Sequence, residues 1–446
     1  MLFRSKKINK KVLKLREAYS DILQYDKYIE DLIVNRKKEF IFNNTGIREI
    51  RERKTDGKDW IVKNIKNNKK IRSKEVELEL KKYNFLNSFF LKYYSENIRQ
   101  YNKKSIFFSF NNIEMKKNIL LKIVEIIGRI DEIVNFEICY RNSYEYKNFF
   151  NSYGSDKSYI LYESEIIISY TLKEKLREEL ITYYDIGTEA LDSVLKNIEF
   201  EIKKDILFSK YANKINKKVS TCIFSPYATG LIVHECFGHL SEIDNENKYY
   251  EWIIGTKIAK DFINIVDSGD IMGSGYLPFD DEGVDSISVN IVKNGVINSY
   301  LTDMKSGILR NHILTGNARA KRLTDIPIVR LRTTYMKAGN NSPYDLSKNI
   351  EKGVYIEDFR NAYIKNDKVY LNLHRAYLIE NGKITNPVIA EKIICNILDI
   401  FKNIDMISNK VEFFNTTLGG CNKKGQNHLR VSYGGPYSRI QEIYIT

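Results

Sequence analysis

The stretch STCIFSPYATGLIVHECFGHLSEI (residues 220–243) holds the most informative pattern in this chain. Its first part, 220–228, is apolar and β-branched and predicts a strand, and a Thr-Gly step then leads into an apolar run. That run contains HECFGH (234–239), with two of the chain's five histidines and a glutamate directly after the first. Zinc sites on helices commonly use HExxH, which is one residue shorter.

The spacing of these histidines constrains the helix that carries them. Residues at i and i+4 of an α-helix share a face, whereas residues at i and i+5 lie about 140° apart. His234 and His239 therefore cannot hold one metal from a regular helix. A π-bulge inserts one residue and restores the common face. Gly238 can adopt unusual backbone angles, so we predict a distorted helix here.

A metal at HECFGH gives the glutamate a role. A catalytic zinc has three protein ligands and one open position. Glu235 would take the proton of a metal-bound water during its attack and return it to the leaving amine. The alternative is a buried helix with two satisfied histidines and a chance glutamate.

The third ligand must come from elsewhere in the chain. Cys421 is the favoured candidate, because glycines flank it in LGGCNKKGQ (418–426) and Lys423 and Lys424 would favour the thiolate. The alternative for Cys421 is a small buried apolar side chain. Acids and other cysteines are alternative third ligands, and so are three histidines: His312, His374 and His428.

Composition bounds the class of protein. Hydrophobic residues make up 43% of the 446 residues, and the net charge is +14, from 71 basic and 57 acidic residues. Basic runs such as KNIKNNKKIRSK (63–74) are more often solvated faces than nucleic-acid sites. The sequence contains no recognised nucleic-acid module, so nucleic acid is an unlikely partner.

Cysteine usage and hydropathy indicate the compartment. The five cysteines are odd in number and scattered, which fits a reducing environment. The most apolar segment (118–134) contains Lys, Glu, Arg and Asp, so it predicts a buried amphipathic helix and no membrane span. The charged N-terminus lacks a signal-peptide core. We therefore expect a cytoplasmic protein without membrane association.

Periodicity predicts an α+β fold in which two domains mix helices with antiparallel sheets. The domains are expected at 1–210 and 211–446, and the second is β-rich and carries the distorted helix. The predicted helices begin in 8–36 and cover 72–102, 116–130 and 173–206. The predicted strands include two around an Asn-Asn-Thr-Gly turn at 39–54, further antiparallel strands at 136–172, and hairpins at 286–303 and 368–385.

Six ordered blocks resemble the TldD/PmbA metallopeptidase family. They are HECFGHLSEID (234–244), GYLPFDDEG (275–283), TGNARAKR (315–322), TTYMKAGNNSP (333–343), AYLIENGKITNPV (376–388) and GGCNKKGQ (419–426). The resemblance covers about half of the chain. Because the chain keeps HExxxH, it is similar to the metal-bearing TldD type, which pairs with a metal-lacking TldE/PmbA-like paralogue.

The resemblance implies a role for each matching residue. His234, His239 and Cys421 would bind Zn²⁺, and Glu235 would be catalytic. Glu242 and Asp244 match acids that follow the motif and would orient the site. The implied activity is hydrolysis of unfolded or leader peptides by a dimer, either with a TldE/PmbA-like paralogue or with itself.

The remaining blocks leave alternatives open. Asp281, in DDEG (280–283), can order a loop, meet a peptide's basic groups or lie in a solvated turn. Asn317 and Arg319 can hold a substrate carboxylate or brace their loop. Strands near 286–303 can accept an extended peptide at a sheet edge.

A second function remains open for the chain as a whole. It can be a non-catalytic, peptide-binding partner subunit of a TldD/TldE-like complex, with a structural metal. A closed four-ligand site that includes His428 would favour this alternative. Cys236, inside the motif, is expected to face the core. Leu240 and Ile243 are bulkier than the family pattern and are expected to narrow the cleft.

Overall fold

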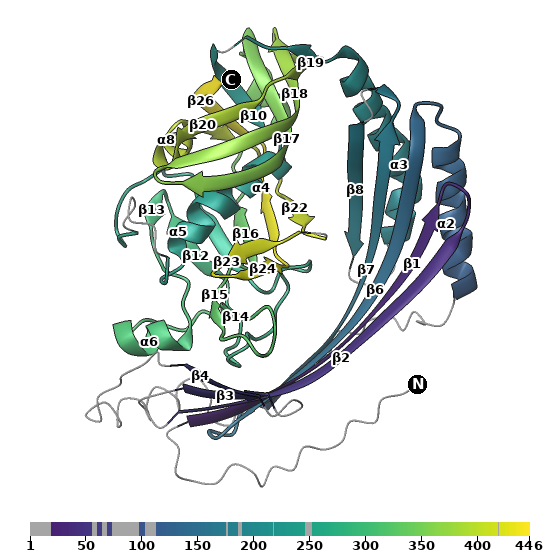
Figure 1. The fold of residues 1–446 in the computed structure, drawn as a ribbon. Helices are drawn as coiled ribbons and strands as arrows, with labels where there is room; N and C mark the ends of the chain where they lie inside the picture. The colour runs from purple at the N-terminus through teal and green to yellow at the C-terminus, as the bar shows by residue number, and fades with distance from the viewer. Residues whose placement is uncertain are drawn as a thin grey trace.

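The computed structural model describes residues 19–55, 60–64, 69–73, 98–102, 113–174, 177–185, 190–216, 218–245, 252–417 and 419–446. Its main elements form one long curved sheet beside a second body built around two shorter sheets (Figure 1). This arrangement of helices with mainly antiparallel strands is the predicted α+β class.

The first sheet has the order β4-β3-β2-β1-β6-β7-β5, with β8 also paired to β7. Long antiparallel strands make up its centre, and only the pair β5–β7 is parallel. The helices α2 and α3 contact this sheet and enclose an apolar core with it. The bounds are β1 Tyr19–Asn35, β2 Phe40–Thr55, β3 Trp60–Asn64, β4 Lys69–Ser73, β5 Ile98–Asn102, α2 Ile113–Gly128, β6 Ile133–Asn151, β7 Asp156–Leu172, β8 Arg177–Asp185 and α3 Ala190–Tyr211.

The second sheet has the order β17-β10-β26-β20-β18-β19-β9, with β21 paired to β26 and β17 also paired to β18. Its long hairpin β17–β18 lies beside β8 in Figure 1. The strand bounds are β9 Asn213–Lys214, β10 Lys218–Phe224, β17 Lys352–Lys365, β18 Lys368–Glu380, β19 Lys383–Ile389, β20 Lys392–Asn396, β21 Ile404–Ile407 and β26 Ser438–Ile445.

The third sheet has the order β13-β12-β11-β16-β25-β22, and two small hairpins, β14–β15 and β23–β24, lie near it. Its strands are β11 Ile265–Ser268, β12 Val289–Lys293, β13 Val296–Ile297, β16 Thr333–Met336, β22 Glu412–Asn415 and β25 Ser432–Gly435. The hairpin strands are β14 Ala318–Arg319, β15 Ile328–Val329, β23 Cys421–Lys423 and β24 Gln426–Leu429. The remaining helices of the described residues are α4 Pro226–Val233, η4 His234–Gly238, α5 His239–Ser241, α6 Met304–Arg310, α7 Pro343–Ser347 and α8 Ile397–Lys402.

Several sequence predictions fail in the first half of the chain. Residues 19–35 of the expected helix at 8–36 form β1, and residues 8–18 lie outside the described residues. The predicted strand pair at 39–54 is one long strand, because β2 pairs with β1 without interruption through Asn43–Gly46. Both ends of the predicted helix at 72–102 are strands, and residues 74–97 lie outside the described part.

Other predictions are confirmed. The helix at 116–130 is α2, the strands at 136–172 are β6 and β7, and both predicted hairpins are present. The helix predicted at 173–206 begins too early, because β8 precedes α3. The strand predicted at 220–228 ends at Phe224, since Pro226 opens α4 and has no N–H for a sheet. The domain boundary at 210/211 falls at the end of α3 and stays a prediction.

Buried ion pairs connect the first sheet to the rest of the chain. Arg53 of β2 donates to Asp21 of β1 and, through Nη1 at 2.7 Å, to Glu282 in the loop before β12. All three side chains are buried. Arg53 therefore neutralises two carboxylates that no longer face bulk water.

We expect Arg53→Ala to destabilise the protein strongly, because it leaves the charges of Asp21 and Glu282 buried without this partner. Loss of one partner of a buried ion pair costs about 3–5 kcal/mol. Arg48→Ala is the matched control, since Arg48 lies on the same strand, pairs with Asp26 and is 41% exposed. The control should change stability by less than about 1 kcal/mol. Equal urea midpoints for the two variants would contradict the assigned role of Arg53.

Candidate metal centre

The HECFGH segment is a helix whose winding changes in the middle. Ser225 caps α4 by accepting from the Ala228 N–H, and Pro226 occupies the first turn. The helix continues through η4, a π-helical turn at His234–Gly238, into α5. The N–H of His239 donates to the carbonyl of His234, five residues back. The predicted π-bulge is confirmed.

The π turn brings the two imidazoles together, with ring centroids 5.2 Å apart. The prediction that Gly238 adopts unusual backbone angles is wrong, because its φ of −54° and ψ of −61° are ordinary helical values. Glycine matters here for its size. A Cβ at this position would lie 2.7 Å from Leu331 Cδ1.

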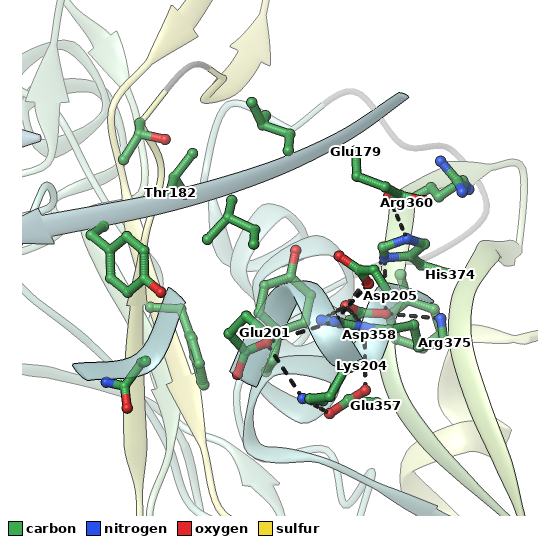
Figure 2. A pocket seen from close by; sticks show the side chains of 18 of the residues that line it. Glu179, Thr182, Glu201, Lys204, Asp205, Glu357, Asp358, Arg360, His374 and Arg375 are labelled. Carbon is green, nitrogen blue, oxygen red and sulfur yellow. Dashed lines mark hydrogen bonds and ion pairs between the residues drawn. The ribbon is translucent and has the colours of Figure 1, made fainter. Parts of the chain in front are cut away.

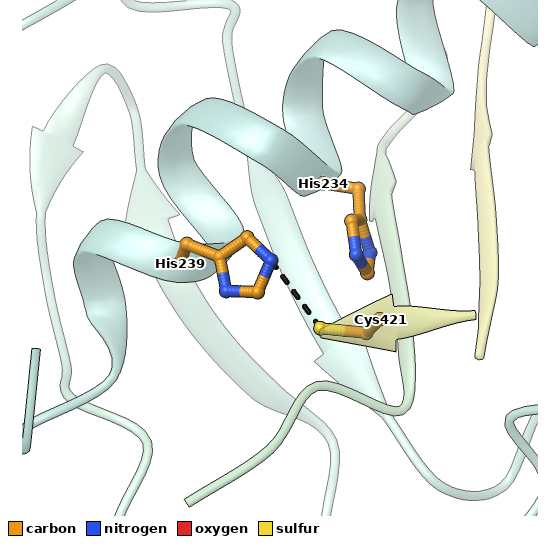
Figure 3. A group of neighbouring side chains, drawn as sticks. All are labelled: His234, His239 and Cys421. Atoms are coloured by element: carbon orange, nitrogen blue, oxygen red, sulfur yellow. Dashed lines mark hydrogen bonds between the residues drawn. The ribbon is translucent and has the colours of Figure 1, made fainter. Parts of the chain in front are cut away.

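Cys421 meets the histidines from the hairpin β23–β24. Its Sγ lies 3.3 Å from Nε2 of His239, and Figure 3 shows His234 beside the same thiol. One donor atom from each of the three side chains lies within 4.8 Å of the others. Arg330 braces the hairpin by donating to the carbonyls of Cys421 and Gln426. Three residues distant in sequence thus converge on one point.

The donor set fits a zinc ion. Nitrogen and sulfur atoms bound tetrahedrally to one zinc lie roughly 3.6 Å apart, close to the 3.3 Å observed. Nδ1 of His234 is buried and has no hydrogen-bond partner in the described structure. The His239 side chain keeps 22% exposure, so the centre opens to solvent on one side. Three donors with an open side match a catalytic zinc better than a closed structural one.

The thiol of Cys421 is poised to ionise. Burial alone would raise its pKa. The charge of His239 and hydrogen bonds from both histidines outweigh burial, so the pKa lies well below the usual thiol value. The prediction that Lys423 and Lys424 favour the thiolate is wrong. Lys423 pairs with Glu242 and Asp244, and Lys424 also faces Asp244. The histidines stabilise the thiolate in their place.

Glu242 and Asp244 lie beside the centre but differ in their contacts. Oε2 of Glu242 is 3.1 Å from Nδ1 of His239 and 3.1 Å from Nζ of Lys423. Glu242 thus fixes the ring whose other nitrogen faces Cys421. Asp244 contacts the two lysines of the hairpin and holds the hairpin against the helix.

Glu235 projects from the π turn next to both histidines and is only partly buried. Burial raises the pKa of its carboxyl, while His239 and His234 lower it by a smaller amount. A carboxylate beside the cluster, with access to solvent, is placed to exchange a proton with water there.

The other predicted site residues have structural partners. Asp281 is buried and accepts from Lys147 Nζ at 2.8 Å and from the Ala320 N–H, so the solvated-turn alternative is wrong. Asn317 donates to Asp267 and to the Arg330 carbonyl. Arg319 donates to the carbonyls of Leu331 and Arg430. These contacts agree with loop bracing.

Several neighbouring predictions can also be compared with the structure. Among the described residues, none of the alternative ligands His312, His374 and His428 belongs to the cluster with Cys421. Cys236 is fully buried, as expected. Leu240 and Ile243 pack into the main core, so they do not narrow the cleft as expected. The predicted docking edge at 286–303 is short, because β12 is an inner strand and β13 has two residues.

Sequence reasoning missed Arg330 and Tyr433. Arg330 is fully buried and holds the Cys421 carbonyl, and Tyr433 is buried with its ring 6.1 Å from that of His234. The arginines of RLR (330–332) alternate along an extended, apolar segment, which is the signal of inward-facing charges that need partners. Tyr433 gives no comparable signal.

Comparison with known proteins agrees with the six sequence blocks. The sequence model described as "PmbA/TldA metallopeptidase C-terminal domain" matches residues 217–446. A metalloprotease of Methanothermobacter thermautotrophicus is 32% identical over 50% of this chain and 49% of its own length. A zinc metalloprotease TldD homolog of Saccharolobus solfataricus is 27% identical over 75% of this chain and 76% of its own. The matched region thus spans about half the length of the first of these relatives.

Solved structures share the whole fold. TldE from Thermococcus kodakarensis has a TM-score of 0.67 at 14% identity, covering 96% of both chains. A Bacteroides thetaiotaomicron protein, named as a candidate modulator of DNA gyrase, has a TM-score of 0.70 at 15% identity, covering 96% of this chain and 94% of its own. In the described part of the chain, the helices are too short or too polar to cross a membrane.

We expect Cys421→Ala to lower the metal content by about one ion per chain, because it removes one of three ligands. Cys236→Ala is the matched control, since Cys236 is a buried cysteine in the same motif but outside the cluster. Elemental analysis after dialysis measures the difference. Equal metal content in the two variants would remove Cys421 from the centre.

Glu242→Gln should weaken metal binding about 10–100-fold, because a carboxylate that orients a ligating histidine also raises its basicity. Asp244→Asn should have a smaller effect, since Asp244 contacts the lysines and not the ring. Competition with a chelator of known affinity measures both. A larger effect for Asp244→Asn would show that hairpin docking matters more than ring orientation.

Proposed function

This chain belongs to the TldD/PmbA metallopeptidase family, and we propose that it is a zinc-dependent peptidase acting on unfolded or leader peptides. The proposal rests on one observation above others. His234, His239 and Cys421 converge beside Glu235 in a centre that is open on the side of His239. Relatives named as metalloproteases, one of them a zinc metalloprotease, support the reaction class.

Each residue of the centre has a role in the proposed reaction. His234, His239 and Cys421 would hold a zinc ion, which would act as a Lewis acid on the scissile carbonyl and lower the pKa of water. Glu235 takes the proton of the attacking water and passes it to the leaving amine. Glu242 keeps the His239 ring in place through Nδ1. Arg330 and Lys423 keep the hairpin of Cys421 against the helix.

The surroundings of the centre favour an extended substrate. Only His239 and Glu235 of the group are partly exposed, so we expect a narrow approach to which a folded protein presents few free backbone segments. We further propose that the chain works as a dimer, with a TldE/PmbA-like paralogue or with itself, which would enclose the centre and exclude folded proteins. The fold shared with a protein named TldE supports the first arrangement.

We expect Glu235→Gln to lower kcat for an unfolded peptide about 10²–10⁴-fold, because it removes the group that moves the proton. KM and zinc content should stay near the wild-type values, since Gln keeps the size of Glu and the three ligands are intact. Peptide cleavage followed by mass spectrometry, with zinc measured on the same samples, tests this.

Two outcomes would overturn the proposal. Undiminished turnover in Glu235→Gln would remove Glu235 from the reaction. A wild-type protein that binds zinc but cleaves no peptide, alone or with a paralogue, would favour the non-catalytic partner subunit.

A further inference from the structure

A large cavity lies between the first sheet and the second body of the protein. Its volume is about 1290 Å³, and β8, α3, β17, β18 and β22 contribute to its walls. Figure 2 shows charged side chains gathered at one end of this cavity. None of the three proposed zinc ligands lines it.

Three potential metal ligands meet at this end. Glu179 comes from β8, Asp205 from α3 and His374 from β18, and one donor atom of each lies within 4.8 Å of the others. Oε2 of Glu179 is 3.1 Å from Nε2 of His374. Oxygen and nitrogen atoms bound to one ion at about 2.1 Å lie roughly 3.0–3.4 Å apart. The distance between Glu179 and His374 therefore fits two ligands of one metal ion, and Asp205 lies close enough to supply a third.

The histidine is oriented as a ligand would be. Its Nδ1 lies 3.2 Å from Oδ2 of Asp358, which leaves Nε2 directed at Glu179. A carboxylate on the far nitrogen of a ligating histidine is a common feature of metal sites. Glu242 has the same relation to His239 at the proposed zinc centre. The two clusters thus share a histidine held by a carboxylate, while the other two donors differ.

The charges around the cluster are unbalanced. The acids Glu179, Glu201, Asp205, Glu357 and Asp358 face Arg375, Lys204 and His374, and His374 adds a positive charge only when it is protonated. Arg375 lies 3.1 Å from Oδ1 of Asp205, and Tyr170 donates to Oδ2. Each carboxylate oxygen has a second lone pair, so Asp205 can still bind a metal. A cation at His374 would balance the excess negative charge.

We propose that Glu179, Asp205 and His374 bind a divalent transition-metal ion such as Zn²⁺ or Mn²⁺. Two carboxylate oxygens and an imidazole nitrogen suit both ions. Because the ligands come from β8, α3 and β18, the ion joins the first sheet and its helix to the second sheet. This site is separate from the thiolate centre and does not depend on the proposed peptidase activity.

Cobalt titration of the metal-free full-length chain distinguishes the two sites. A cobalt thiolate absorbs in the near ultraviolet, so this band reports Cys421, whereas the proposed site has no sulfur. We expect Cys421→Ala to lose the band and still bind about one Co²⁺ per chain. Adding His374→Ala or Glu179→Gln should weaken that remaining binding at least about 10-fold.

His312→Ala in the same background is the matched control, because the His312 ring lies against Tyr300 and outside both clusters. It should leave the cobalt affinity unchanged. Glu179→Gln keeps the size of the side chain, so the test survives if His374→Ala fails to fold. No cobalt binding in Cys421→Ala, or equal binding with and without Glu179→Gln, would overturn the proposal. An NMR titration in which His374 gains and loses a proton while the protein binds no metal would also overturn the proposal. It would show that a proton, and not a metal ion, balances the charge of the network.

Discussion

The π turn at His234–Gly238 is the constraint around which the candidate metal centre is built. Without the inserted residue, the i and i+5 histidines would point in directions about 140° apart. Such a turn weakens the regular helical ladder, so its surroundings must stabilise it. Phe237 stacks on Phe401 with centroids 3.9 Å apart, and Cys236 is fully buried beside it. The apolar side of the turn thus fixes where its polar side points.

Buried polar contacts then determine where the hairpin of Cys421 can lie. Asp267 accepts from the backbone and side chain of Arg332 and from Asn317, at the centre of the third sheet. Arg330, two residues earlier than Arg332, reaches the carbonyl of Cys421. A buried guanidinium without partners is costly, so these residues accept few alternative arrangements. The thiol is therefore positioned by the same residues that hold the sheet together.

The sequence predicted the centre better than the first half of the fold. HECFGH limits the backbone to a distorted helix, because chemistry and spacing leave few options, and Cys421 stands out through its flanking glycines. Residues 19–35 contain no comparable restriction. Their apolar residues fit helical spacing nearly as well as strand spacing, and pairing with β2 and β6 over the whole length decides the outcome. That pairing is tertiary and cannot be seen in a local pattern.

The same limit explains why the sequence left open whether Asp281, Asn317 and Arg319 bind substrate or brace their loops. A polar side chain in a glycine-containing loop gives the same local signal whether it faces a ligand or a partner strand. Asp281 faces Lys147 of β6, which lies more than a hundred residues earlier in the chain.

Charge complementarity, together with apolar packing, sets how the first sheet sits against the rest of the chain. An apolar cluster with Phe149 and Phe279 lies at this contact, but apolar packing is tolerant of sliding. Ion pairs are directional, and three of them, Lys147–Asp281, Lys157–Asp285 and Arg430–Glu163, are spread along β6 and β7. A shift of one residue along a strand would reverse each side chain to the other face and separate every pair at once. The sheet is therefore held in a single register against the second body.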